Sequence, residues 1–469
     1  MISLCQNRER KYETMQLMPI RPRIVDYALF PRVIRVRVET SFILYGVGIE
    51  TALAPNTAYR VRFLPQEEIA TARTLCIGDN GCYPEIAVKT DETGVITFAH
   101  AFPREEIYTV RLLRENGDRV ADCKVFAARD DLWERIPMRG NTHCHVCFSS
   151  DGHEDPVIAA SLYRKAGYDY LAITDHHKID GSVYAIDHTS DLPMEMALYY
   201  GEEVHVPNAY LHIAGIGARM PGGEGLDAYY HAHEEEVNAK VAAIAAAYAD
   251  KLPAGVEPLD FAWRKWVSDT IHARGGISII AHPFWEYDAN NTSNAMLRYM
   301  IETKLFDAME VIHGQDDPDC TDANRQVAFW NDLRAEGLFI PVVGVDDAHR
   351  RIRNWDYASD FNMAYTIIFA KDKSMAGFAE AIRGGYSVAV SHRAGMVGDV
   401  VGTYRLTTFA IFLLENYYPF HDDLCFEEGR AVKEAYLGSE EDKRLLGVLN
   451  GRVARFTDKF YGRGGKTDV

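Results

Sequence analysis

The sequence predicts an α/β protein in which a barrel-type domain follows a β-sandwich and precedes a set of helices. From about 21 to 130, short alternating segments separated by turn signals predict the sandwich. From 131 to 395, strand-like and helix-like segments alternate, as in a parallel barrel. Residues 396–469 have apolar helical faces that we expect to pack on the barrel, and residues 1–20 form a polar tail.

Length and composition favour a globular protein. With 469 residues, the chain is long enough for two or three domains, and its 47% hydrophobic content is ordinary for a protein with a large core. The net charge of −18 disfavours nucleic-acid polymers and anionic membranes as partners. Eight cysteines and the lack of a membrane-length apolar run predict a cytoplasmic protein with reduced thiols, whose oligomeric state stays open.

The barrel region contains seven expected strands with helices between most of them. Asp155 is a plausible N-cap and Pro156 a first helical residue, and Gly167 ends that helix. The expected strands are 138–145, 170–174, 197–204, 211–215, 277–281, 308–312 and 340–345. The other expected helices are 226–251, 259–274, 293–304 and 321–336.

A pair of histidines, His143 and His145, ends the first expected strand. Alternate residues of a strand point to the same side, so both imidazoles can reach one metal ion. His231 and His233 have the same spacing but lie in an expected helix. Residues two apart in a helix point about 200° apart, so we expect this second pair to lie in solvent.

Further potential ligands follow the later strands, whose C-terminal ends form the active-site face of a barrel. They are Asp151, His176, Glu203, His282, Asp347 and His349, together with His212 inside the fourth strand. Glu202 faces away from Glu203 on a strand, whereas His205 shares its face and is a rival ligand. His313 either lines the pocket or packs as a polar core residue. The set predicts a metal site.

The motifs resemble those of the PHP family, the polymerase and histidinol phosphatase family of metal-dependent hydrolases, over about residues 136–395. The matching motifs are His143-x-His145, Ser150-Asp151-Gly152, Thr174-Asp175-His176, Gly201-x-Glu203, His212, Ala281-His282-Pro283 and Asp347-x-His349. Asp151 departs from the pattern because it follows His145 by six positions instead of the usual five.

The resemblance implies a distorted (β/α)7 barrel and up to three divalent ions, which would be Zn, Mn or Fe. One ion would be held by His143, His145, Glu203 and Asp347. Glu203 would bridge to a second ion, held also by His212 and His282. The third would be held by Asp151, His176 and His349.

Such a site predicts hydrolysis of a small anionic ester. Three divalent ions against three carboxylates leave about three positive charges in the cleft. We expect that a hydroxide held by the metals would attack phosphorus, so that no protein nucleophile would be needed. His177 is either a proton donor or a group beside the ligands. Lys178, Arg350 and Arg351 either bind the phosphate or form a solvated charge run.

Three functions stay open, and charge favours the first, a phosphoesterase acting on a small phosphate ester. Residues 140–152, the VDDAH ending at His349 and the preceding β-domain are similar to a carbamate-hydrolase-like branch of PHP proteins. Hydrolysis of a carboxyl ester, carbamate or amide by the same site is therefore the second. The third is a non-catalytic binding protein on a degenerate barrel.

Overall fold

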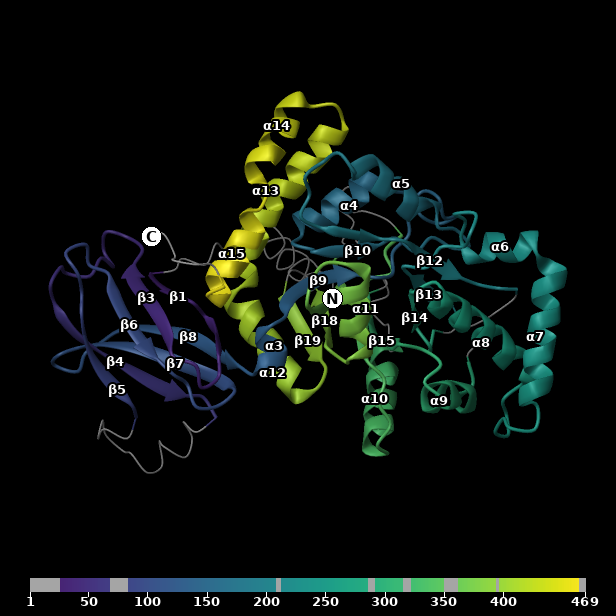
Figure 1. Cartoon of the computed structure of the whole chain (residues 1–469), viewed down its shortest axis with the longest axis horizontal. Coiled ribbons are helices and arrows are strands. Elements are labelled where there is room, and N and C mark those ends of the chain that lie inside the picture. Colours follow the sequence, from purple (N-terminus) through teal and green to yellow (C-terminus); the bar gives the residue numbers. More distant parts are fainter. Residues whose placement is uncertain are drawn as a thin grey trace, which may run out of the picture. The chain divides into compact units, whose positions relative to one another are not determined.

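The computed structural model describes residues 26–67, 83–207, 212–285, 292–314, 322–349, 362–393 and 396–463 (Figure 1). These residues divide into two compact units. The strand–helix unit contains Pro137–Ala410 and Asp422–Asn450. The β-rich unit contains the described residues of Met18–Ile136, Ile411–His421 and Gly451–Val469. The polar tail expected at 1–20 lies outside the described residues.

The β-rich unit has two sheets. A three-stranded sheet has the order β1 (Tyr27–Phe30), β3 (Thr40–Gly46), β6 (Ile96–His100). A five-stranded sheet has the order β2 (Val33–Arg35), β8 (Arg119–Ala128), β7 (Glu106–Arg114), β4 (Ala58–Pro65), β5 (Glu85–Lys89). Apolar side chains from both sheets form one hydrophobic cluster, in which Phe42 and Phe98 stack with ring centroids 5.1 Å apart. Burial of one face of each strand explains the alternation in the sequence.

Helix α15 (Arg452–Tyr461) belongs to the β-rich unit. The backbone N–H of Arg32 donates to the carbonyl of Phe460 at 2.8 Å, and the Lys459 ammonium lies over the Phe30 ring. The expectation that all C-terminal helices pack on the barrel region is therefore wrong for α15. The apolar face of α15 could pack on the barrel region or on the β-rich unit, so the sequence pattern does not predict which of the two it contacts.

Two mixed sheets form the strand–helix unit. The first has the order β11 (Ala197–Tyr199), β10 (Tyr170–Ala172), β9 (Ile136–Asn141), β17 (Ala364–Ala370), β18 (Ser387–Arg393), β19 (Met396–Val401). The second has the order β12 (Gly201–Val204), β13 (Ile213–Ile216), β14 (Ile277–Ile280), β15 (Ala308–His313), β16 (Val342–Val345). β19 corrects the expectation that the chain after 396 is helical, because this segment pairs antiparallel with β18.

Strand direction also differs from the all-parallel expectation. β13 runs antiparallel to β12 and to β14, with Ile213 opposite Val204 and Ile280. The start of β13 therefore lies at the same edge as the ends of its neighbours. His212 immediately precedes β13 and reaches that edge, although it is not at the C-terminal end of a strand.

Helices follow most strands, and their local signals match the sequence. Helix α4 (Pro156–Lys165) begins after Asp155, whose side chain accepts from the backbone N–H groups of Val157 and Ile158, and Gly167 beyond its end has φ 89°. The single helix expected at 226–251 is instead two, α6 (Leu226–Ala232) and α7 (Glu234–Tyr248), broken at His233. The others are α3 (Asp130–Trp133), α5 (Asp180–Thr189), α8 (Pro258–Ala273), α9 (Asn294–Glu302), α10 (Asp322–Ala335) and α11 (Met375–Arg383).

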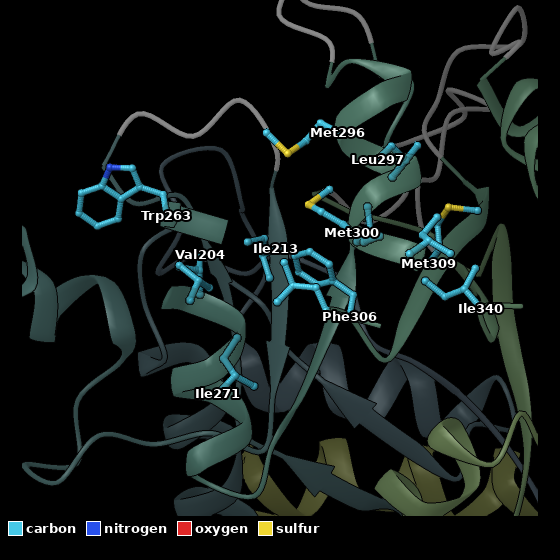
Figure 2. Packing of buried hydrophobic residues seen from close by; sticks show 14 of the residues in the cluster. Val204, Ile213, Trp263, Ile271, Met296, Leu297, Met300, Phe306, Met309 and Ile340 are labelled. Carbon is cyan, nitrogen blue, oxygen red and sulfur yellow. The ribbon is translucent and has the colours of Figure 1, made fainter. Parts of the chain in front are cut away.

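The core beside the five-stranded sheet of this unit is aliphatic and aromatic. Figure 2 shows Met296, Leu297 and Met300 of α9 near Phe306 and Met309. The spacing of Met296, Leu297 and Met300 places these three side chains on one face of α9, and burial of that face holds the helix against the sheet. Helices α12 (Tyr404–Asn416), α13 (Tyr418–Tyr436) and α14 (Glu440–Leu449) lie between β19 and α15. Among the described residues, no helix combines the length and apolar character required to cross a bilayer.

Candidate metal centre

All nine predicted metal ligands lie in overlapping groups at one edge of the two mixed sheets. Within each group the ligand atoms are within 4.8 Å of one another. The groups are His145, Asp151, His176 and His349; His143, His145 and Glu203; His143, His282 and Asp347; His176, Glu203 and His205; and Glu203, His212 and His282. His205, the rival ligand, lies within the cluster beside Glu203.

The first histidine pair is placed by the pairing of two strand ends. His143 and His145 follow β9, and the intervening Cys144 forms a parallel bridge with Ala348 beyond β16. The N–H of Asp347 donates to the carbonyl of His143 at 3.0 Å, and that of His145 donates to the carbonyl of Ala348 at 2.8 Å. The extended backbone points both imidazoles into the cluster and Cys144 towards the carbonyl of Ala172.

Glu203 is the central carboxylate. It is fully buried at the end of β12, with Oε1 2.7 Å from His212 Nδ1 and 3.5 Å from His282 Nε2. Oε2 lies 2.7 Å from His176 Nδ1 and 3.3 Å from His143 Nε2. The neighbouring Glu202 faces the other way, and its carboxylate accepts from the backbone N–H groups that begin α6.

The donor set fits divalent cations. Both oxygens of Glu203, Nε2 of His143 and Nδ1 of His212 are buried, and although these atoms lie close to one another, none of them makes a hydrogen bond of suitable geometry. Such atoms are rare in folded proteins, because an unsatisfied buried polar group costs about 1–3 kcal/mol. All are nitrogen or oxygen atoms of the types that ligate divalent metals, so cations between them satisfy the whole set.

The charges also favour a cation. Burial raises the pKa of Glu203, but the surrounding imidazoles, led by His212, bring it well below its ordinary value. Burial likewise opposes ionisation of Asp347, and His143 and His145 outweigh it, so that its pKa is well below the usual range. Burial lowers the pKa of His145 to about 4. Burial also lowers the pKa of His143, but Asp347, Glu310 and Glu203 outweigh it and raise the pKa well above its ordinary value. The carboxylates therefore attract positive charge to this place, and a bound cation would take the place of that proton.

The outer group, which we define as Asp151, His176 and His349, is more exposed. The Asp151 side chain is 46% exposed, and its Oδ2 is 3.1 Å from His176 Nε2 and 3.5 Å from His349 Nε2. Ser149 Oγ donates to the other oxygen at 2.6 Å. A Cβ at Gly152 would lie 2.0 Å from the carbonyl of Val146, so only glycine lets the loop fold back. The tightly folded loop therefore brings Asp151 to the cluster although it follows His145 by six positions.

Of the four other predicted site residues, the structure describes two, Lys178 and His177. Lys178 Nζ donates to the carbonyl of Phe148 at 3.1 Å. Arg350 and Arg351 lie outside the described residues. His177 borders the cluster, with its ring centroid 4.6 Å from that of His205 and its side chain 56% exposed. Its Nδ1 is 2.5 Å from Oδ2 of the buried Asp227 on α6.

The sequence reasoning missed two carboxylates, Asp227 and Glu310. Glu310 is fully buried in β15, and its Oε1 is 2.8 Å from His143 Nδ1. An acidic residue between the apolar Met309 and Val311 of a buried strand is the signal that would have found it. Asp227 lies in the first turn of a helix, where acidic residues are common for other reasons, so it carries no distinctive signal. His313 also reaches the cluster, with Nε2 2.9 Å from Asp347 Oδ2.

Comparison with known proteins gives distant structural likenesses. No protein-family model and no curated protein matches the chain. It is similar to a two-domain protein containing a predicted PHP-like metal-dependent phosphoesterase from Bacteroides vulgatus ATCC 8482, with 16% identity and a TM-score of 0.39, over 59% of this chain and 70% of that one.

Two further solved structures are similar to it. One is a protein from Bifidobacterium adolescentis ATCC 15703 described as a metal-dependent phosphoesterase, with 17% identity and a TM-score of 0.32, over 47% of this chain and 92% of that one. The other is an amidohydrolase from Chromobacterium violaceum with bound sulfate and no metal, with 18% identity and a TM-score of 0.30, over 45% of this chain and 87% of that one. Because these TM-scores are low, the likenesses give no evidence about function, and any functional assignment depends on the residues of the site itself.

Proposed function

We propose that this protein is a metal-dependent hydrolase of the PHP type, and that it acts as a phosphoesterase on a small anionic phosphate ester. The observation that carries the proposal is the fully buried Glu203, whose two oxygens face separate groups of histidines. A buried carboxylate shared between ligand groups is the arrangement that a bridged metal cluster requires.

The ligands divide into three positions. In this proposal His143, His145, Glu203 and Asp347 hold one ion, and Glu203, His212 and His282 hold a second. The outer group holds a third, and the ions are Zn, Mn or Fe. When bound, such ions supply the charge that holds an anionic ester and lower the pKa of a water molecule to the neutral range.

In this proposal His177 donates a proton to the leaving group. Its Nδ1–H donates to the Asp227 carboxylate, which fixes the ring. In the doubly protonated ring, Nε2–H is then the group that would pass its proton to the leaving group, and the ring would become neutral. The backbone N–H of His205 donates to the same oxygen at 3.3 Å, so Asp227 is held from a second direction. His177 has φ 60°, the strained left-handed conformation that often marks functional residues. Lys178, Arg350 and Arg351 stay as proposed phosphate-binding residues.

The architecture that goes with this function is also a proposal. The two mixed sheets would form the distorted (β/α)7 barrel at 131–395, and the two sheets of the β-rich unit a sandwich at 21–130. The contacts that favour barrel closure are the bridge between His176 and Glu203, which joins the ends of β10 and β12, and the hydrogen bond from Gly344 N to Thr366 Oγ1, which joins β16 to β17.

A panel of p-nitrophenyl esters tests the function. The purified protein, loaded with Mn²⁺ or Zn²⁺, is assayed on the phosphate, the bis-phosphate and carboxyl esters. We expect turnover of a phosphate ester that a chelator removes. Turnover of carboxyl esters alone would replace the phosphoesterase by the carboxyl-ester hydrolase. No turnover by the fully metal-loaded protein would favour the binding protein.

A further inference from the structure

We propose that Glu310 is a positioning residue that orients one ligand from each of the two buried ion positions. The inference rests on the proposed function, because it requires that the cluster binds metal. Glu310 lies in β15, on which Met309 and Val311 are buried apolar neighbours, and it is itself fully buried. A carboxylate in such a place costs free energy unless both oxygens have partners.

Each oxygen of Glu310 accepts one hydrogen bond from a different ligand segment. Oε1 accepts from His143 Nδ1–H at 2.8 Å, and Oε2 accepts from the backbone N–H of His282 at 2.8 Å. These two bonds connect Glu310 to the end of β9 and to the end of β14, so one side chain sets the spacing between two ligand segments.

The bond to His143 also selects the tautomer. A carboxylate oxygen only accepts, so Nδ1 of His143 carries a hydrogen, and Nε2 is left as the ring nitrogen that can bind a metal. That Nε2 lies 3.3 Å from both Glu203 Oε2 and Asp347 Oδ1 and has no hydrogen-bond partner. Glu310 therefore turns the ligating atom of His143 into the cluster.

The outer group is oriented by different atoms. His176 Nδ1 is 2.8 Å from His205 Nε2, and His349 Nδ1 donates to the backbone carbonyl of Asp347 at 2.8 Å. Loss of the Glu310 carboxylate should therefore weaken the two buried positions selectively. Loss of a carboxylate that orients a metal-bound histidine typically lowers metal affinity 10–100-fold.

The test is a calorimetric titration of metal-stripped protein with Zn²⁺. Glu310→Gln keeps the shape of the side chain but adds an amide that can donate, so it no longer selects the His143 tautomer. We expect the Kd for Zn²⁺ at the two tighter sites, which we assign to the two buried positions, to rise 10–100-fold. The Kd of the weakest site, which we assign to the outer group, should stay unchanged. Glu310→Asp, which keeps the charge, should recover part of the loss and replaces Glu310→Gln if that variant does not fold.

Asp307→Asn is the matched control. Asp307 is also a largely buried carboxylate of the strand–helix unit, but its oxygens accept from His272, Arg383 and the backbone of Ser278, none of which is a ligand. The Zn²⁺ affinities of Asp307→Asn should equal those of the unmodified protein. Equal loss in Asp307→Asn and Glu310→Gln, or no loss in Glu310→Gln, would overturn the role of Glu310. If the unmodified protein bound no Zn²⁺, the proposed function would fail with it.

Discussion

The backbone N–H of Asp347 donates to the carbonyl of His143 and thereby joins the end of β16 to the end of β9. This bond brings Asp347 Oδ1 within 3.3 Å of His143 Nε2 and 2.9 Å of His145 Nε2. Asp347 adopts φ 49°, a left-handed conformation that costs about 1–2 kcal/mol outside glycine. This strained conformation occurs where the Asp347 carboxylate faces two imidazoles. Backbone strain of this kind is commonly found at functional sites.

Replacing both histidines of the first motif should abolish hydrolysis. His143→Ala with His145→Ala removes two ligand atoms from the most buried part of the cluster, so bound metal should fall with activity. Elemental analysis and the ester panel measure the two effects. His231→Ala with His233→Ala is the control, because this pair has the same spacing but is exposed on and beside α6. Full activity in the His143 and His145 variant would show that the cluster is not the site of hydrolysis.

His177→Gln should lower kcat without changing bound metal. A positioned general acid contributes about 10²- to 10⁴-fold, so a decrease of at least about 100-fold is expected with a poor leaving group. Asp227→Asn should give a smaller decrease, because the ring remains but loses its fixed orientation. His153→Gln, at an exposed position, is the control and should behave like the unmodified protein. A normal kcat in His177→Gln would exclude the proton-donor role.

Removing metal should lower the thermal stability of the protein. Ions bind the assembled cluster and not the dispersed ligands of the unfolded chain, so free metal at a hundred times Kd adds about 2.7 kcal/mol per independent site. Differential scanning calorimetry before and after dialysis against a chelator measures the change, and added Zn²⁺ should reverse it. Identical unfolding curves would show that the cluster does not hold ions.

Breaking the ion pair between Arg164 and Glu428 should strongly destabilise the strand–helix unit. The guanidinium is fully buried and donates to Glu428 Oε2 at 2.7 and 3.0 Å. Arg164→Met leaves the buried carboxylate of Glu428, and that of Asp169 at 3.3 Å, without this cation, a change that typically costs about 3–5 kcal/mol. Denaturation in urea measures the loss. The double variant Arg164→Met with Glu428→Leu should regain much of it, and equal loss in both variants would contradict this account.

Asp307 should make stability pH-dependent in the acid range. Burial raises its pKa, but hydrogen bonds from His272 and Arg383 outweigh this and hold it below the ordinary 3.8. The folded state therefore binds the proton less readily than the unfolded state, so the stabilisation is present above about pH 4 and is lost as pH falls through the folded pKa. Asp307→Asn should reduce the slope of unfolding free energy against pH below pH 4. An unchanged slope would show that Asp307 does not contribute.

Local signals in the sequence predicted much of the secondary structure. Asp155 and Gly167 bound α4 as expected, because an N-cap side chain and a left-handed C-terminal residue act within one turn. The break between α6 and α7 and the strands β17, β18 and β19 were missed. Pairing with a neighbouring strand decides whether a short β-branched segment is extended, and the partner is not visible in the segment itself.

The sequence by itself predicted which side chains form the cluster, since the order and spacing of the nine ligand-type residues indicate a metal site. Only the tertiary structure decided how they meet. Antiparallel β13 brings His212 to the ligand edge, and Glu310 and Asp227 approach their histidines from elements distant in the chain. The physical reason is that ligand identity is a property of a side chain, whereas hydrogen-bond partners and strand direction depend on contacts between segments far apart in sequence.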